Sequence, residues 1–69
     1  MENKEIVQRT IQQIGIVYPS AVHIRSSCKD SFYNGLIYDL RTDAHINVRA
    51  ECVNGDLYVT FKEVNYERI

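Results

Sequence analysis

Apolar residues near the start of the chain recur with the period of an α-helix. Plotted at about 100° per residue, the aliphatic side chains of residues 3–17 fall within an arc of about 140°. They are Ile6, Val7, Ile11, Ile14 and Val17. Glu5 and Arg9, on the opposite side, have the i,i+4 spacing of a helical ion pair, and Asn3 is placed to cap the first turn. The sequence therefore predicts an amphipathic helix over residues 3–17.

Beyond Pro19 the pattern changes to alternation of apolar and polar residues, which is typical of half-buried strands. The predicted strands are residues 21–28, 32–41, 45–53 and 56–64. With no internal repeat or linker-like segment, all elements are expected to share one core within a single domain, residues 1–69. The predicted fold class is α+β, with one N-terminal helix packed on a four-stranded antiparallel meander.

The turn between the last two predicted strands has the strongest chemical signature. Asn54-Gly55 suits a two-residue type I′ hairpin, because both central residues of that turn need positive φ. This turn sets Arg49 opposite Thr60 and places Cys52 on the opposite, core-facing side. Polar residues then face polar residues along the hairpin.

The other two turns are predicted from the side chains that they bring together. A loop over residues 42–44 sets Tyr38 opposite Val48. A three-residue loop after Cys28 sets that residue opposite Phe32. In this register the core-facing residues of the second strand are Phe32, Leu36, Tyr38 and Leu40.

The side of the sheet away from the helix is the predicted open face. Its candidate partner-binding residues are His23, Arg25, Tyr33, Ile37, Arg49, Glu51, Tyr58, Thr60 and Lys62. One interpretation is a solvated surface on which opposite charges pair across strands. The other is a binding surface, because Ile37 occupies a position where a polar residue is expected, and tyrosine with arginine is typical of interfaces.

Composition bears on the class of partner. The chain has 69 residues, with 8 basic and 9 acidic side chains and a net charge of -1. A nucleic-acid-binding module that uses the basic and aromatic residues of the predicted open face is the alternative hypothesis. However, Glu51 and Asp39, which the register places on the same face, would repel phosphates.

The residues that could support chemistry do not converge in this register. Cys28 and Cys52 are expected to face the core about 10 Å apart, too far for a disulfide, so both should be free thiols. His23 and His45 are expected to face outward, so the four residues would not share a metal ion. Asp39 lies near His23, but a flat sheet has no water-excluding pocket for a catalytic triad. We expect no enzyme activity, cofactor or metal.

The remaining expectations concern location and assembly. No apolar run is long enough to span a bilayer and the first residues are polar, so a cytoplasmic location is expected. The strand 56–64 is a regular sheet edge that favours a homodimer or an added partner strand. The sequence leaves open whether Tyr66 and Ile69 pack on the helix or contact a neighbouring subunit.

The expected function is that of a small non-enzymatic protein-binding module. An inhibitor or adaptor, such as a phage or mobile-element accessory protein that acts on a host system, is one concrete form. That last step rests on a general expectation for small, near-neutral single-domain chains, and no residue shows it.

Overall fold

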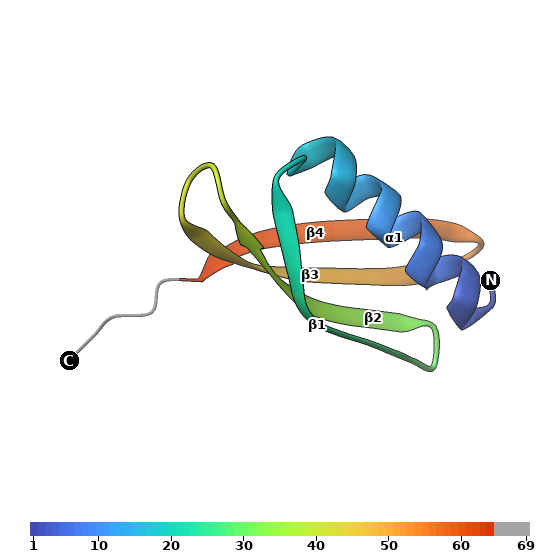
Figure 1. The fold of residues 1–69 in the computed structure, drawn as a ribbon. Coiled ribbons are helices and arrows are strands. Elements are labelled where there is room, and N and C mark those ends of the chain that lie inside the picture. The colour runs from blue at the N-terminus through green and yellow to red at the C-terminus, as the bar shows by residue number, and fades with distance from the viewer. Residues whose placement is uncertain (65–69) are drawn as a thin grey trace.

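The protein consists of one helix laid across one side of an antiparallel sheet (Figure 1). The structure is a computed structural model and describes residues 1–64. Its elements are α1 (Asn3–Val17), β1 (Ala21–Lys29), β2 (Phe32–Asp39), β3 (Ala44–Val53) and β4 (Asp56–Val64). The sheet order is β1-β2-β3-β4, so the predicted α+β fold is confirmed. The predictions for Tyr66 and Ile69 lie outside the described residues.

The buried stripe of α1 is narrower than predicted. Ile6, Thr10 and Ile14, each four residues apart, are the buried side chains of the helix. Ile11 is 42% exposed and Val17 is 48% exposed, so their predicted core positions are wrong. The helix therefore contributes one row of side chains to the core, and a threonine occupies the centre of that row.

The start of α1 is fixed by a tertiary contact. Within the described chain no side chain caps the helix, so the predicted capping role of Asn3 is wrong. Instead, Asn3 Oδ1 accepts a hydrogen bond from the backbone N–H of Ser31, at 3.0 Å. This bond ties the first helical turn to the β1–β2 turn. The predicted ion pair between Glu5 and Arg9 is present, at 3.2 Å.

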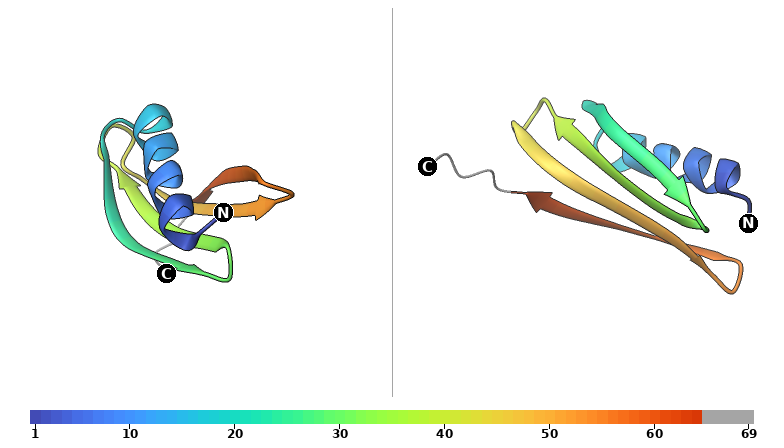
Figure 2. Two further views of the ribbon diagram at one scale, coloured as in Figure 1. Left: turned by 90° about the vertical axis from the view of Figure 1, so that its right-hand side faces the viewer. Right: turned by 90° about the horizontal axis from the view of Figure 1, so that it is seen from below.

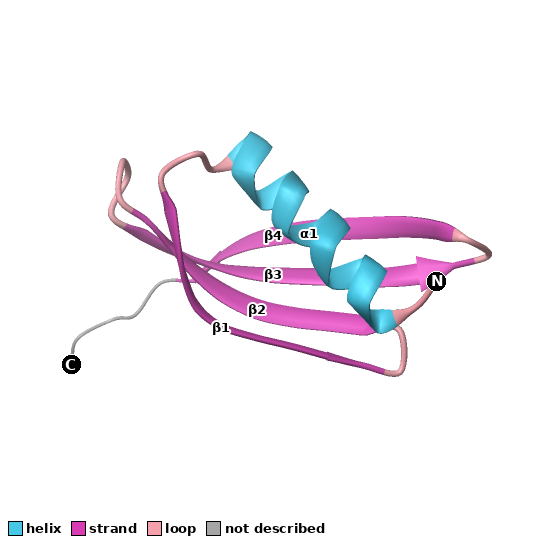
Figure 3. Ribbon diagram, turned by 45° about the vertical axis from the view of Figure 1, so that its right-hand side comes forward, coloured by secondary structure: helices cyan, strands magenta, loops and turns pink. Residues whose placement is uncertain are grey.

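The core lies between α1 and the strands beneath it. Its buried residues are Ile6, Ile14, Tyr33, Ile37, Ile46, Val48 and Ala50. The helix crosses the sheet obliquely, and the tip of the β3–β4 hairpin projects beyond it (Figures 2 and 3). Leu57, Val59 and Phe61, on the helix side of β4, are therefore only partly buried. The ring of Phe61 meets that of Tyr18 edge-on, with centroids 5.3 Å apart.

The predicted β3–β4 register is confirmed. Arg49 lies opposite Thr60, and Val53 and Asp56 close the hairpin. Asn54 and Gly55 have φ values of 52° and 82°, as a type I′ turn requires.

The predicted β2–β3 register is wrong by three residues. Tyr38 lies opposite His45 and not opposite Val48. Because side chains alternate along a strand, an odd shift exchanges the two sides of β2. Tyr33 and Ile37 are therefore buried beneath the helix.

A close approach of β1 and β2 accounts for the orientation of β2. A β-carbon at position 35 would lie 2.9 Å from Tyr33 Oη and 3.1 Å from the backbone oxygen of Arg25. The tyrosine ring thus occupies the space that a side chain at Gly35 would fill. This arrangement places both residues on the helix side of the sheet.

A side chain in the β2–β3 turn is the second cause. Asp39 is buried and accepts hydrogen bonds from Thr42 Oγ1 at 2.9 Å and from the backbone N–H of Arg41 at 3.3 Å. These bonds end β2 at Asp39, two residues earlier than predicted, and leave Leu40 exposed in the turn.

The register of β1 differs from the prediction only near the β1–β2 turn, because Val22 lies opposite Tyr38 and His23 opposite Ile37, as the predicted loop would set them. Asp30 and Ser31 both have positive φ and form a two-residue turn, so Cys28 lies opposite Tyr33 and not opposite Phe32. Further along, a bulge between His23 and Arg25 moves the strand by one residue. Cys28 nevertheless packs against the core, as predicted.

Candidate binding surface

The side of the sheet opposite α1 carries both apolar and charged residues. We call it the uncovered face. Its residues are Val22, Arg25, Ser27, Lys29, Phe32, Asn34, Leu36, Tyr38, His45, Asn47, Arg49, Glu51, Val53, Asp56, Tyr58, Thr60, Lys62 and Val64. Their placement follows from the strand pairing, because alternate residues of each strand face the core.

Six of the nine predicted binding residues lie on this face. They are Arg25, Arg49, Glu51, Tyr58, Thr60 and Lys62. All six come from β1, β3 or β4. Residues from β3 and β4 were placed correctly because the Asn-Gly turn determines their register without reference to β2.

The other three predicted binding residues do not lie there. Tyr33 is 1% exposed and Ile37 is 0% exposed, and both belong to the core. His23 lies opposite Ile37, so it shares the helix side of the sheet, although its side chain is exposed at the margin. The reversed β2 register explains all three displacements.

The same reversal brings side chains to the uncovered face that the sequence analysis assigned to the core. Phe32 is 40% exposed, whereas Leu36 is only 6% exposed and yet does not belong to the core cluster. Tyr38 lies beside His45, with ring centroids 5.0 Å apart. Thus β2 is apolar on both of its sides.

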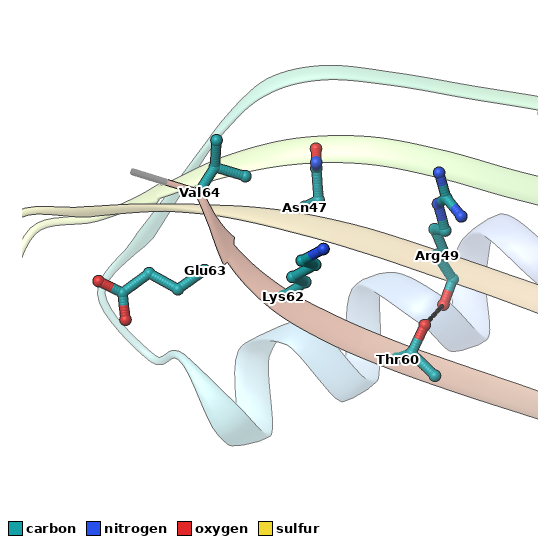
Figure 4. Close-up of a pocket in the computed structure, with 6 residues that line it drawn as sticks. All are labelled: Asn47, Arg49, Thr60, Lys62, Glu63 and Val64. Atoms are coloured by element: carbon teal, nitrogen blue, oxygen red, sulfur yellow. Dashed lines mark hydrogen bonds between the residues drawn. The ribbon is translucent and has the colours of Figure 1, made fainter. Parts of the chain in front are cut away.

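A depression along β3 and β4 extends from Arg49 and Thr60 at one end to Glu63 and Val64 at the other (Figure 4). It has a volume of about 510 Å³ and is lined by Asn47, Arg49, Thr60, Lys62, Glu63 and Val64. The Thr60 hydroxyl donates a hydrogen bond of 3.4 Å to the backbone oxygen of Arg49, so β3 and β4 are also joined by a side chain here. Its lining includes two cationic residues, Arg49 and Lys62, and one acidic residue, Glu63.

A second, smaller depression of about 190 Å³ adjoins the first. It is lined by Phe32, Arg49, Ala50, Glu51, Tyr58 and Thr60. Arg49 and Thr60 line both depressions, so the two form one continuous concave strip. One end of the strip contains two cationic side chains and one carboxylate, whereas the other combines two aromatic rings with a carboxylate.

Tyr38 is linked to the β2–β3 turn. Its hydroxyl donates a hydrogen bond to Asp43 Oδ1. This hydrogen bond, together with desolvation and the nearby carboxylates, raises the pKa of the Tyr38 hydroxyl. The group is therefore a neutral hydrogen-bond donor at physiological pH.

The catalytic and metal-binding alternatives gain no geometric support. Asp39, which the sequence placed on the open side, is engaged in the turn described above and is buried on the helix side. Among residues 1–64, no cluster of three metal-ligating side chains occurs. Cys28 and Cys52 are free thiols that pack against the core, as predicted. In the same residues, no helix has the length and hydropathy needed to cross a membrane.

Comparison with protein-family models, curated protein sequences and solved structures finds no match to this chain.

Proposed function

We propose that this protein is a non-enzymatic binding module whose uncovered face receives another protein. The main observation behind the proposal is the concave strip. Arg49 is at its centre because it lines both depressions, with Phe32 and Tyr58 on one side and Lys62 on the other. Arginine and tyrosine in a central, partly enclosed position are the residue types that most often dominate protein–protein binding energy. Exposed aromatic area adds to this, because two-torsion side chains lose little entropy on binding.

The charge distribution favours a protein partner over nucleic acid. Glu51 lies directly opposite Tyr58, so a carboxylate stands beside the ring on which a base would have to stack. Mixed charges beside apolar rings suit a protein surface of complementary charge.

A charge-reversal variant tests the proposal. Arg49→Glu should remove the complex that the wild-type chain forms with a protein captured from a bacterial lysate, and nuclease treatment should leave the wild-type complex intact. With the purified partner we expect an affinity loss of about 30-fold or more, as is typical for a central arginine. The free energy of unfolding should change by less than about 0.5 kcal/mol, because Arg49 is exposed.

The matched control is Arg41→Glu, which makes the same charge change in the β2–β3 turn, outside the concave strip. This control should bind as the wild type does. Equal binding by wild type and Arg49→Glu would refute the proposal. Binding that disappears with nuclease and weakens steeply with salt would instead establish the nucleic-acid alternative.

A further inference from the structure

The two edges of the sheet differ. The outer strands are β1 and β4, and among the described residues no strand pairs with the outer edge of either. β1 contains a bulge, which interrupts the regular row of backbone groups that another strand would need. Pairing between β3 and β4 runs from Val53–Asp56 to His45–Val64 without a shift, so β4 is a regular edge. It is the edge suited to strand addition.

We propose that a second copy of this chain pairs antiparallel with β4, with the two-fold axis passing beside Val59. A two-fold axis perpendicular to the sheet relates two β4 strands that run in opposite directions. The backbone groups are correctly oriented for this register. In a two-residue hairpin the closing residues, Val53 and Asp56, exchange hydrogen bonds, so the N–H and C=O groups of Leu57, Val59 and Phe61 point away from β3.

On the helix side, this register pairs apolar residues only. Val59 meets Val59 of the second copy, and Leu57 meets Phe61. Moving the axis to Thr60 would set Leu57 opposite the carboxylate of Glu63. We call the contact between the two β4 strands the seam. The Val59-centred register therefore places no charged side chain among the apolar residues of the seam.

On the uncovered face, the same register is complementary in charge. Asp56 of each copy lies opposite Lys62 of the other, and Tyr58 lies opposite Thr60. Because the axis repeats every contact, each dimer contains two Asp56–Lys62 pairs. Opposite charges at both ends of the seam support the antiparallel orientation and the register together.

The space beside β4 also suits a second copy. A groove of about 650 Å³ lies between α1 and β4, lined by Arg9, Gln12, Gln13, Leu57 and Val59. The helix leaves these two apolar β4 side chains only half-covered. Adding the second β4 would place Val59 and Phe61 of that copy along the open side of the groove. The seam would thereby acquire apolar packing that the single chain lacks.

The dimer does not depend on the proposed protein-binding function. Tyr58, Thr60 and Lys62 belong both to the concave strip and to the β4–β4 contact. Arg49 lies on β3, one strand away from that contact, so it takes no part in the pairing. Pairing would place the uncovered faces of the two copies side by side on one sheet of eight strands, four from each chain.

Sedimentation equilibrium of the purified chain from micromolar to millimolar concentration tests the pairing. The wild type should be a dimer at the upper concentrations. Asp56→Lys and Lys62→Asp, made singly, should each raise the dissociation constant about tenfold or more, because two opposite-charge pairs per dimer become like-charge pairs. The double variant Asp56→Lys/Lys62→Asp should recover wild-type affinity. Arg49→Glu, the control, should dimerise normally.

Circular dichroism of each variant confirms that its fold is intact. A wild type that stays monomeric at millimolar concentration would overturn the proposal. A dimer unaffected by the single variants, or one that the double variant fails to restore, would place the contact elsewhere and would equally overturn it. Loss of partner binding by Arg49→Glu is measured separately, so failure of either proposal can be distinguished from failure of the other.

Discussion

Gly35→Ala tests the orientation of β2, on which the composition of the uncovered face depends. The new methyl group would lie 2.9 Å from Tyr33 Oη, 3.1 Å from Tyr33 Cε1 and 3.1 Å from the backbone oxygen of Arg25. The tyrosine is fully buried, and the Arg25 backbone is held by the pairing of β1 with β2. Neither neighbour can move away without disturbing the core.

The expected magnitude follows from two opposing effects. Inserting a methylene-sized group into a packed core costs about 1–3 kcal/mol. Replacing glycine by alanine also restricts the unfolded chain, which stabilises the folded state by about 0.4–1 kcal/mol. Taking the middle of each range, the free energy of unfolding should therefore fall by about 1.3 kcal/mol, within limits of about 0–2.6 kcal/mol. In the register predicted from sequence, position 35 would face the open side and the same substitution would be tolerated.

Urea denaturation followed by circular dichroism measures this change, and Gly15→Ala provides the control. A β-carbon at Gly15 would meet nothing within 4 Å, and the residue lies within α1, so alanine there should raise the free energy of unfolding by about 0.5–1 kcal/mol. Opposite signs are thus expected for one substitution at two sites. If Gly35→Ala stabilises the protein as Gly15→Ala does, Tyr33 does not cover Gly35 and the orientation of β2 is wrong.

Two further substitutions examine the core. Ile37→Asp should prevent folding, because it buries a carboxylate beneath the helix at a cost of several kcal/mol. A native circular dichroism spectrum of this variant would contradict the burial of Ile37. Tyr33→Phe should raise the free energy of unfolding by about 1 kcal/mol at pH 7, because Tyr33 Oη is buried without a well-formed hydrogen bond among residues 1–64. Burial raises the pKa of Tyr33, with Ser26 opposing the rise. Above about pH 10 the unfolded chain therefore loses this proton before the folded chain does, and stability falls with rising pH. Urea titrations at several alkaline pH values should show a shallower fall for Tyr33→Phe, and equal slopes would refute the assignment.

The elements that sequence predicts well carry local signals. The helical period gave the bounds of α1. Asn54-Gly55 determined the β3–β4 register, because Asn-Gly is strongly preferred where a two-residue turn needs positive φ at both positions. These signals do not require knowledge of the rest of the fold. They were sufficient to place Arg49 and Tyr58 on the same face of one hairpin.

The orientation of β2 was not predictable from alternation, because both of its sides are apolar. Phe32 and Leu36 occupy one side, and Tyr33 and Ile37 the other, so hydrophobic pairing is satisfied in either orientation. The deciding contacts are polar or steric. Asp39 ends the strand through side-chain hydrogen bonds in the turn, a role that aspartate at the start of a turn commonly has.

The reversal of β2 changes what the uncovered face can do without moving its centre. Exchanging Ile37 and Tyr33 for Leu36 and Phe32 leaves both apolar area and an aromatic ring on this face. Arg49 stays in place because the β3–β4 hairpin fixes it independently of β2. An error in the β2 orientation would therefore alter the apolar surroundings of Arg49 but not its exposure. For this reason Arg49→Glu tests the binding proposal and Gly35→Ala tests the fold, and neither result can substitute for the other.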